Sequence, residues 1–225
     1  ANSASDVGNS EYDIRKKMIE EGIISQMVTL PSNMFASVTL PATLWFFDKQ
    51  KPNTDKKDKI LFIDARNVFT QIDRAHRKFS DEQIKNLGII TKLYNGDEQA
   101  FIDLVEEYRA ELTSAPEQSD DKEVITKAYW QAQIDWLLER FPEGKYRDVI
   151  GLCKVASLEG EDGIIDQDYS LNAGRYVGVV IEDDGMTKEE FKAEMLSLNS
   201  KLAKLNEEAH SLETLISNNF KELLG

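Results

Sequence analysis

Cysteine and histidine, two residue types that often act as nucleophile and base, are sparse in this sequence. It contains one cysteine, Cys153, and two histidines, His76 and His210. A cysteine nucleophile needs a base and a group that orients the base, and no such arrangement accompanies Cys153 or His76 along the chain. His76 has no other histidine, cysteine or paired carboxylate at metal-ligand spacing. We therefore expect Cys153 to be a small buried residue, and we expect no catalytic role and no metal site for Cys153 or His76.

Basic residues cluster in one place, where Arg74, His76, Arg77 and Lys78 follow one another closely. This cluster is either a solvated helix or loop face or a contact for phosphate groups. The formal net charge of the chain is −14. Such a surface repels a phosphate backbone, which argues against broad non-specific nucleic-acid binding by the chain alone.

An aromatic residue, Phe35, follows a predicted strand in the segment LPSNMF, residues 30–35. In open α/β sheets, ligands bind in the crevice beyond the carboxyl ends of the strands. Phe35 therefore either fills the edge of the core or stacks on a ligand in that crevice.

Three short apolar runs could form the sheet that positions these residues, at 23–30, 42–47 and 60–63. The second and third are nearly continuous, which is typical of strands covered on both faces. The segment between them, residues 49–59, is rich in lysine and aspartate and is predicted to be a solvated connection. A short amphipathic helix, residues 11–21, precedes the first run and favours an α/β arrangement.

The rest of the chain is predicted to be mainly helical. Ser80 and Gln83 form a capping box for a helix that ends near Tyr94, and helical spacing of apolar residues continues at 98–112 and 122–140. A second capping box, at residues 187–190, opens the last helix. Its apolar residues alternate steps of four and three, as a coiled-coil seam does, at Phe191, Met195, Leu198, Leu202, Leu205, Ala209, Leu212 and Ile216.

Such a long apolar seam needs a partner, which could be another protein, a second copy or a helix of the same chain. We expect the partner interface to consist of Phe191, Met195, Leu198, Leu202, Leu205, Leu212 and Ile216. The single cysteine excludes an internal disulfide and favours a reducing compartment. The sequence has no run of about 18 apolar residues that could span a membrane. We therefore expect a cytoplasmic location.

Several motifs, in order along the chain, resemble one family. They are IRKK (14–17), LPSNMF (30–35), LPATLWFF (40–47), LFIDAR (61–66), FSDEQI (79–84), YRDVIGLCK (146–154) and GRYVG (174–178). The series is similar to the C-terminal part of the modification subunit of type I restriction–modification systems, the adenine-N6 DNA methyltransferases. The resemblance implies a partial methyltransferase-type α/β sheet, a mainly helical region and a long C-terminal coiled-coil helix. It divides the chain into residues 1–79, 80–180 and 181–225.

The resemblance also implies what the intact subunit would do. Such enzymes bind S-adenosylmethionine through a glycine-rich loop and hold the flipped adenine with an Asn/Asp-Pro-Pro-aromatic motif, and this sequence contains neither motif. We therefore expect a fragment that is inactive alone and binds no S-adenosylmethionine. In the family, the aromatic residue of the segment matching LPSNMF lies near the target base, which would give Phe35 a stacking role. In this sequence Phe35 is followed by ASVT, where the family more often has YGTG.

The partners that the resemblance implies are the specificity and restriction subunits, with DNA bound through the complex. Self-association through the C-terminal helix is the alternative. A different class of function also fits the same residues, namely a non-enzymatic interaction module that acts through its coiled coil.

Overall fold

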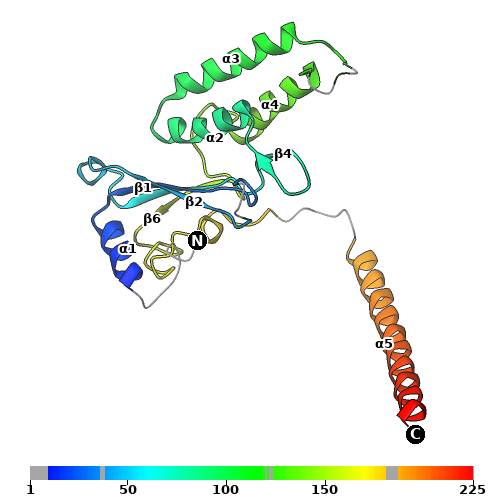
Figure 1. The fold of residues 1–225 in the computed structure, drawn as a ribbon. Helices are drawn as coiled ribbons and strands as arrows, with labels where there is room; N and C mark the ends of the chain where they lie inside the picture. The colour runs from blue at the N-terminus through cyan, green and yellow to red at the C-terminus, as the bar shows by residue number, and fades with distance from the viewer. Residues whose placement is uncertain (1–9, 36–38, 120, 122–123, 181–186, 225) are drawn as a thin grey trace. The chain divides into compact units, whose positions relative to one another are not determined.

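The computed structural model describes residues 10–35, 39–119, 121, 124–180 and 187–224 (Figure 1). The chain consists of two compact units, Ala1–Val180 and Ile181–Gly225. The division of the first unit at residue 79 stays a prediction.

The first unit is built on a four-stranded mixed sheet with the strand order β2-β1-β3-β6. The strands are β1 (Ile24–Thr29), β2 (Thr43–Phe47), β3 (Lys59–Asp64) and β6 (Cys153–Ser157). The central strands β1 and β3 are parallel, while β2 and β6 are antiparallel to their neighbours. The three apolar runs are thus confirmed as strands, and the chain contains an α/β sheet as expected.

The rest of the chain was expected to be mainly helical, but it also adds a strand to the sheet, because β6 pairs with the far edge of β3. Its sequence, CKVAS, is short and contains a lysine, so it lacks the apolar run that marked the other strands. The basic cluster also forms a small hairpin, with β4 (Thr70–Gln71) antiparallel to β5 (Arg77–Lys78).

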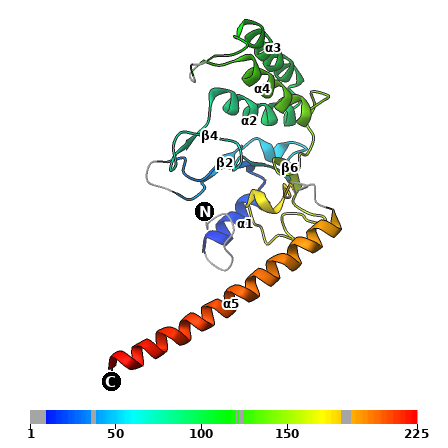
Figure 2. The ribbon, with the colours of Figure 1, turned by 90° about the vertical axis from the view of Figure 1, so that its right-hand side faces the viewer.

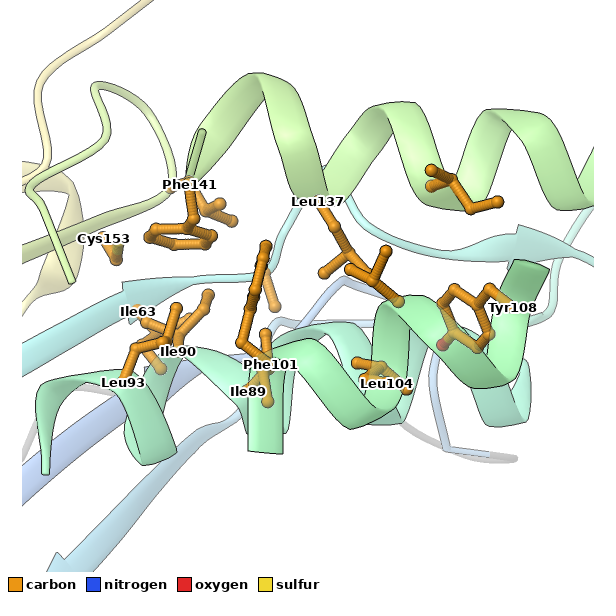
Figure 3. Packing of buried hydrophobic residues seen from close by; sticks show 14 of the residues in the cluster. Ile63, Ile89, Ile90, Leu93, Phe101, Leu104, Tyr108, Leu137, Phe141 and Cys153 are labelled. Carbon is orange, nitrogen blue, oxygen red and sulfur yellow. The ribbon is translucent and has the colours of Figure 1, made fainter. Parts of the chain in front are cut away.

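Both faces of the sheet are covered, and successive residues of β3 point to opposite sides. Leu61 and Ile63 belong to the core on one side, and Ile60 and Phe62 belong to the core on the other. Figures 1 and 2 show the helices α2, α3 and α4 on the first side and α1 on the second. The first core is a dense layer of aliphatic and aromatic side chains in which Phe101 and Phe141 meet edge to face (Figure 3).

The helices begin and end close to where the sequence places them. They are α1 (Ser10–Glu20), α2 (Asp81–Tyr94), α3 (Glu98–Ser114) and α4 (Lys127–Arg140). The capping box of α2 is confirmed: Ser80 Oγ accepts from the Gln83 backbone N–H, and Gln83 Oε1 accepts from the Ser80 N–H. The last of these helices begins five residues later than predicted, at Lys127 and not at residue 122.

One further expectation about the sheet was wrong. Strand β2 was expected to be covered on both faces, but it is an edge strand, and Leu44, Phe46 and Phe47 are 42%, 43% and 52% exposed. The connection between β2 and β3 is mostly exposed, as expected, but Lys51 within it is buried. Its Nζ donates hydrogen bonds to the carbonyl oxygens of Gly22 and Lys57, at 3.0 and 2.6 Å.

The second unit contains the helix α5 (Lys188–Leu224), 37 residues long. Its capping box is present: Glu190 N donates to Thr187 Oγ1 at 3.2 Å, and Thr187 N donates to Glu190 Oε2 at 2.8 Å. The long C-terminal helix is thus confirmed.

Candidate functional site at the carboxyl ends of the parallel strands

The strands β1 and β3 end side by side, at Thr29 and Asp64, which are partners in the parallel register. Ala65 N donates to Thr29 O at 2.9 Å, which continues the ladder one residue past β3. Both terminal side chains are buried, and Thr29 Oγ1 has no hydrogen-bond partner among the described residues. This edge therefore carries polar groups inside the protein, where their burial costs free energy unless they find partners.

Asp64 is held by the guanidinium of Arg66. Arg66 Nε donates to both carboxylate oxygens, at 2.9 and 3.0 Å, and Nη2 donates to Oδ2 at 2.6 Å. Arg66 N also donates to Oδ1, at 3.1 Å. The hydrogen bond to Asp64 raises the pKa of Arg66. The forked hydrogen bonds from Arg66 compensate the negative charge of the buried carboxylate. They also fix the direction of the chain where it leaves β3.

The segment GRYVG reaches this same edge from the far end of the first unit. A Cβ on Gly174 would lie 3.0 Å from Arg66 Nη2, so glycine permits the close approach of the two segments. Two residues on, the ring of Tyr176 stacks on Phe62 of β3, with centroids 4.1 Å apart. Asn172 supports the turn, because its side chain accepts from Gly174 N at 3.1 Å. Two of the motifs noted in the sequence thus meet at the end of β3.

The basic hairpin packs against the segment that follows β1. Arg77 N donates to Asn33 O and Arg77 Nη1 donates to Ser32 Oγ, both at 3.0 Å. The Arg77 guanidinium also lies 3.9 Å from the centroid of the Phe69 ring. Asn33 has a φ of 61°, a left-handed conformation that asparagine tolerates better than most residues. The hairpin therefore fixes the path of residues 30–35, and one of its cations is used for this purpose.

The other members of the basic cluster stay exposed: Arg74, His76 and Lys78. His76 Nδ1 lies 2.8 Å from a carboxylate oxygen of Asp73. Hydrogen bonds from Ala75 N and from the His76 ring lower the pKa of Asp73. Phe35, at the end of the segment that the hairpin holds, is 51% exposed. The edge thus combines an exposed aromatic ring with exposed cations, an arrangement that suits binding.

Comparison with known proteins identifies the family of this chain. The model of the family described as N-6 DNA methylase matches residues 2–184. The chain belongs to the N-6 DNA methylase family.

Two curated relatives are type I restriction enzyme methylase subunits. The MjaIX subunit of Methanocaldococcus jannaschii is 32% identical over 224 residues, which are 100% of this chain and 30% of the relative. The HindI subunit of Haemophilus influenzae is 28% identical over 218 residues, which are 96% of this chain and 37% of the relative. This member of the N-6 DNA methylase family thus spans about a third of the length of these relatives.

A solved structure of a type I restriction-modification system methyltransferase subunit from Streptococcus thermophilus is also similar to this chain. It shares 21% identity, with a TM-score of 0.45, over 80% of this chain and 25% of that one.

Among the described residues of this family member, no helix is long and apolar enough to cross a membrane.

The predicted site residues of this N-6 DNA methylase family member lie in different places. Phe35 is at the carboxyl edge, and its stacking role stays a prediction; the residues that follow it, 36–38, lie outside the described part. Cys153, at the start of β6, is buried in the core that contains Leu61 and Ile63. Burial raises the pKa of its thiol to about 12. The seam residues lie on α5, and their role as an interface also stays a prediction. No group of three potential metal ligands occurs in the described part of the chain.

Sequence reasoning missed the ion pair of Asp64 and Arg66 and the anchoring role of Arg77. The first had a readable signal, since an acid at the end of an apolar strand with an arginine two residues later is well placed for pairing. The second had none, because the contact of Arg77 with Ser32 joins residues 45 positions apart.

An apolar groove with a volume of about 440 Å³ lies in the same unit. Its walls come from β1, β2, the end of β3 and α2, and include Leu44, Phe46, Ile84 and Leu87. It exists because β2 extends past the cover that α2 gives to the sheet. The described lining of this groove in the N-6 DNA methylase family member is mostly apolar, with Gln26, Thr91 and Lys92 as its polar residues.

Proposed function

We propose that this chain is part of the methylase subunit of a type I restriction–modification system. The intact subunit would transfer a methyl group from S-adenosylmethionine to adenine N6 in DNA. The observation that carries the proposal is the family match over residues 2–184, supported by full-length similarity of this chain to named methylase subunits.

In this proposal, the chemistry depends on residues that this sequence does not contain. The five prolines stand apart from one another, so no Asn-Pro-Pro-aromatic motif is present, and no glycine-rich loop follows a strand and opens a helix. The chain alone would then neither bind S-adenosylmethionine nor methylate DNA. Its own contribution would be to complete the fold of the catalytic unit and to assemble the complex.

The carboxyl edge is the part of the chain that we place closest to the DNA. Phe35 would stack on the target adenine once it has left the duplex, since aromatic rings hold flipped bases in this way. Arg74 and Lys78 would lie near the phosphates of that strand, while Arg77 holds residues 30–35 in place. Sequence recognition would be the task of another subunit, which fits the acidic balance of this chain.

The helix α5 would provide the contact with the specificity and restriction subunits. Its seven predicted interface residues are 51–62% exposed, so the helix leaves an apolar surface uncovered within its own unit. The same observation supports a second candidate function, a non-enzymatic module that acts through its coiled coil. The two candidates differ in whether the first unit has any role in methylation.

Substitution of Phe35 in the intact subunit separates these candidates. We expect Phe35→Ala to lower adenine methylation by roughly tenfold or more, because base–aromatic stacking contributes about 1–3 kcal/mol. Phe47→Ala is the matched control, since Phe47 is equally exposed (52% against 51%) but lies on the edge strand β2. Fluorescence of 2-aminopurine at the target position should report reduced base flipping in the Phe35 variant alone.

Titration calorimetry of the chain itself tests the proposal that it binds no S-adenosylmethionine alone. We expect no heat of binding with S-adenosylmethionine. Micromolar affinity for S-adenosylmethionine, or unchanged methylation and base flipping with Phe35→Ala, would contradict the proposed role of this chain.

A further inference from the structure

The helix α5 carries charges beside its apolar seam, and their order constrains how two such helices can pair. The seam positions repeat without interruption from Phe191 to Ile216, and Figure 2 shows α5 as one continuous helix. In coiled coils, the residues that flank the seam decide partner and orientation. On α5, the flanking positions are occupied by Lys192, Glu194, Asn199, Lys201, Asn206, Glu208, Glu213 and Leu215.

A parallel pair of α5 helices in register would be electrostatically unfavourable. In that arrangement, Glu194, Lys201 and Glu208 each face the flanking residue five positions later on the second copy. Glu208 would face Glu213, while Glu194 and Lys201 would face the neutral Asn199 and Asn206. The parallel pair therefore contains a repeated repulsion and no attractive pair.

An antiparallel pair with full overlap of the seam behaves in the opposite way. The apolar residues then meet in four kinds of pairs across the two copies: Phe191 with Ile216, Met195 with Leu212, Leu198 with Ala209, and Leu202 with Leu205. In the flanks, Lys201 faces Glu208 of the second copy and Lys192 faces Glu213. Twofold symmetry repeats both ion pairs. The remaining flanking pairs, Asn199 with Asn206 and Glu194 with Leu215, contain no like charges.

Sliding this antiparallel pair by one heptad destroys the match. In one direction Lys201 faces Lys201 of the second copy and Glu194 faces Glu208; in the other, Glu208 faces Glu208. The arrangement that buries the whole seam is thus the same one that brings every flanking cation opposite an anion. Burial of the seam and pairing of opposite charges thus favour the same register, as expected for a pairing that the sequence specifies.

We propose that in the chain alone, where no other subunit covers the seam, α5 pairs with α5 of a second copy as an antiparallel two-stranded coiled coil, with Leu202 and Leu205 at its centre. The seam covers more than three heptads, the length at which such pairing becomes stable. This inference goes beyond the proposed function and does not depend on it. If α5 bound only a specificity subunit, the chain alone would stay monomeric, and the methylase proposal would stand.

Sedimentation equilibrium of the full chain and of charge variants tests the proposal. We expect a dimer for the unmodified chain, and a dissociation constant raised by about tenfold for Glu208→Lys, because two attractive pairs become Lys–Lys pairs. The double variant Lys201→Glu with Glu208→Lys should restore the affinity. Glu207→Lys makes the same charge change at an outward-facing position and serves as the matched control, with little effect expected.

The orientation has a direct readout as well. Spin labels on Ala193→Cys, an outward-facing position, should lie roughly 30 Å apart along the axis in the antiparallel dimer, since residue 193 then lies opposite residue 214. In a parallel dimer they would lie level with each other. A chain that stays monomeric at submillimolar concentration, a tighter dimer with Glu208→Lys, or labels that lie level would overturn the proposal.

Discussion

Lys51 is a buried cation that joins two connections of the first unit, and its removal should change how stability depends on pH. Its side chain is 4% exposed, and its Nζ donates to Gly22 O, in the turn before β1, and to Lys57 O, in the turn before β3. Burial lowers the pKa of Lys51 to about 8, although Asp58 and Asp48 counteract the shift. The folded state therefore binds the lysine proton less tightly than the unfolded state does.

The sign and size of the effect follow from this difference. Between pH 8 and about 10.5, the unfolded chain keeps a proton on Lys51 that the folded chain has released, so stability rises with pH in this window. Below pH 8 both states are protonated, and the folded state carries the whole cost of the buried charge, roughly 3 kcal/mol. Between pH 7 and 9.5, this one group should add about 2 kcal/mol to the free energy of unfolding.

Urea denaturation of the full chain and of Lys51→Met at several pH values isolates this contribution. Groups other than Lys51 titrate alike in both proteins, so the difference between the two stability curves should change by about 2 kcal/mol from pH 7 to 9.5. Lys49→Met, at an exposed lysine of the same connection, is the control and should give a curve parallel to that of the unmodified chain. Parallel curves for Lys51→Met as well would refute the argument.

Four further predictions concern the packing of the first unit. Cys153 should react with a thiol reagent only in denaturant, because burial raises its pKa to about 12; reaction in the native state at the rate of a free thiol would contradict this. Gly22→Ala should lower the melting temperature, since Gly22 has a φ of 74° and a Cβ there would lie 2.9 Å from the Lys57 side chain; Gly88→Ala, in open space on α2, should raise stability by about 0.5–1 kcal/mol. Phe141→Ala should cost about 3–5 kcal/mol by denaturation, because the ring is fully buried.

Much of the fold could be predicted because its signals are local. The apolar runs of β1 and β3 lie in consecutive residues, and the capping box at Ser80 and Gln83 needs only a spacing of three. The seam of α5 is visible for the same reason, since each step of three or four residues falls within one turn of helix. Such features depend on neighbours in sequence, so a single sequence contains them completely.

The features that escaped prediction depend on distant parts of the chain. Strand β2 has the composition of a central strand, but its place at the edge is decided by which strands pair, and so Phe46 and Phe47 stay exposed. Lys51 lies in a segment that has the composition of a solvated loop. Its amine nevertheless donates to carbonyl groups from two different turns. Composition predicts the average environment of a residue type, and these residues differ from that average for tertiary reasons.

Three motifs that are each weak in the sequence meet at the carboxyl ends of the parallel strands. LPSNMF leaves β1 there, LFIDAR ends there with Asp64 bound to Arg66, and GRYVG arrives there because Gly174 permits close contact with Arg66. None of the three contains a residue with evident catalytic chemistry. Their common feature is position, because β1 and β3 end side by side there and LPSNMF leads from that edge to the exposed ring of Phe35. The stacking role proposed for Phe35 would need a rigid segment, since the stacking energy is realised only if the ring is already in place.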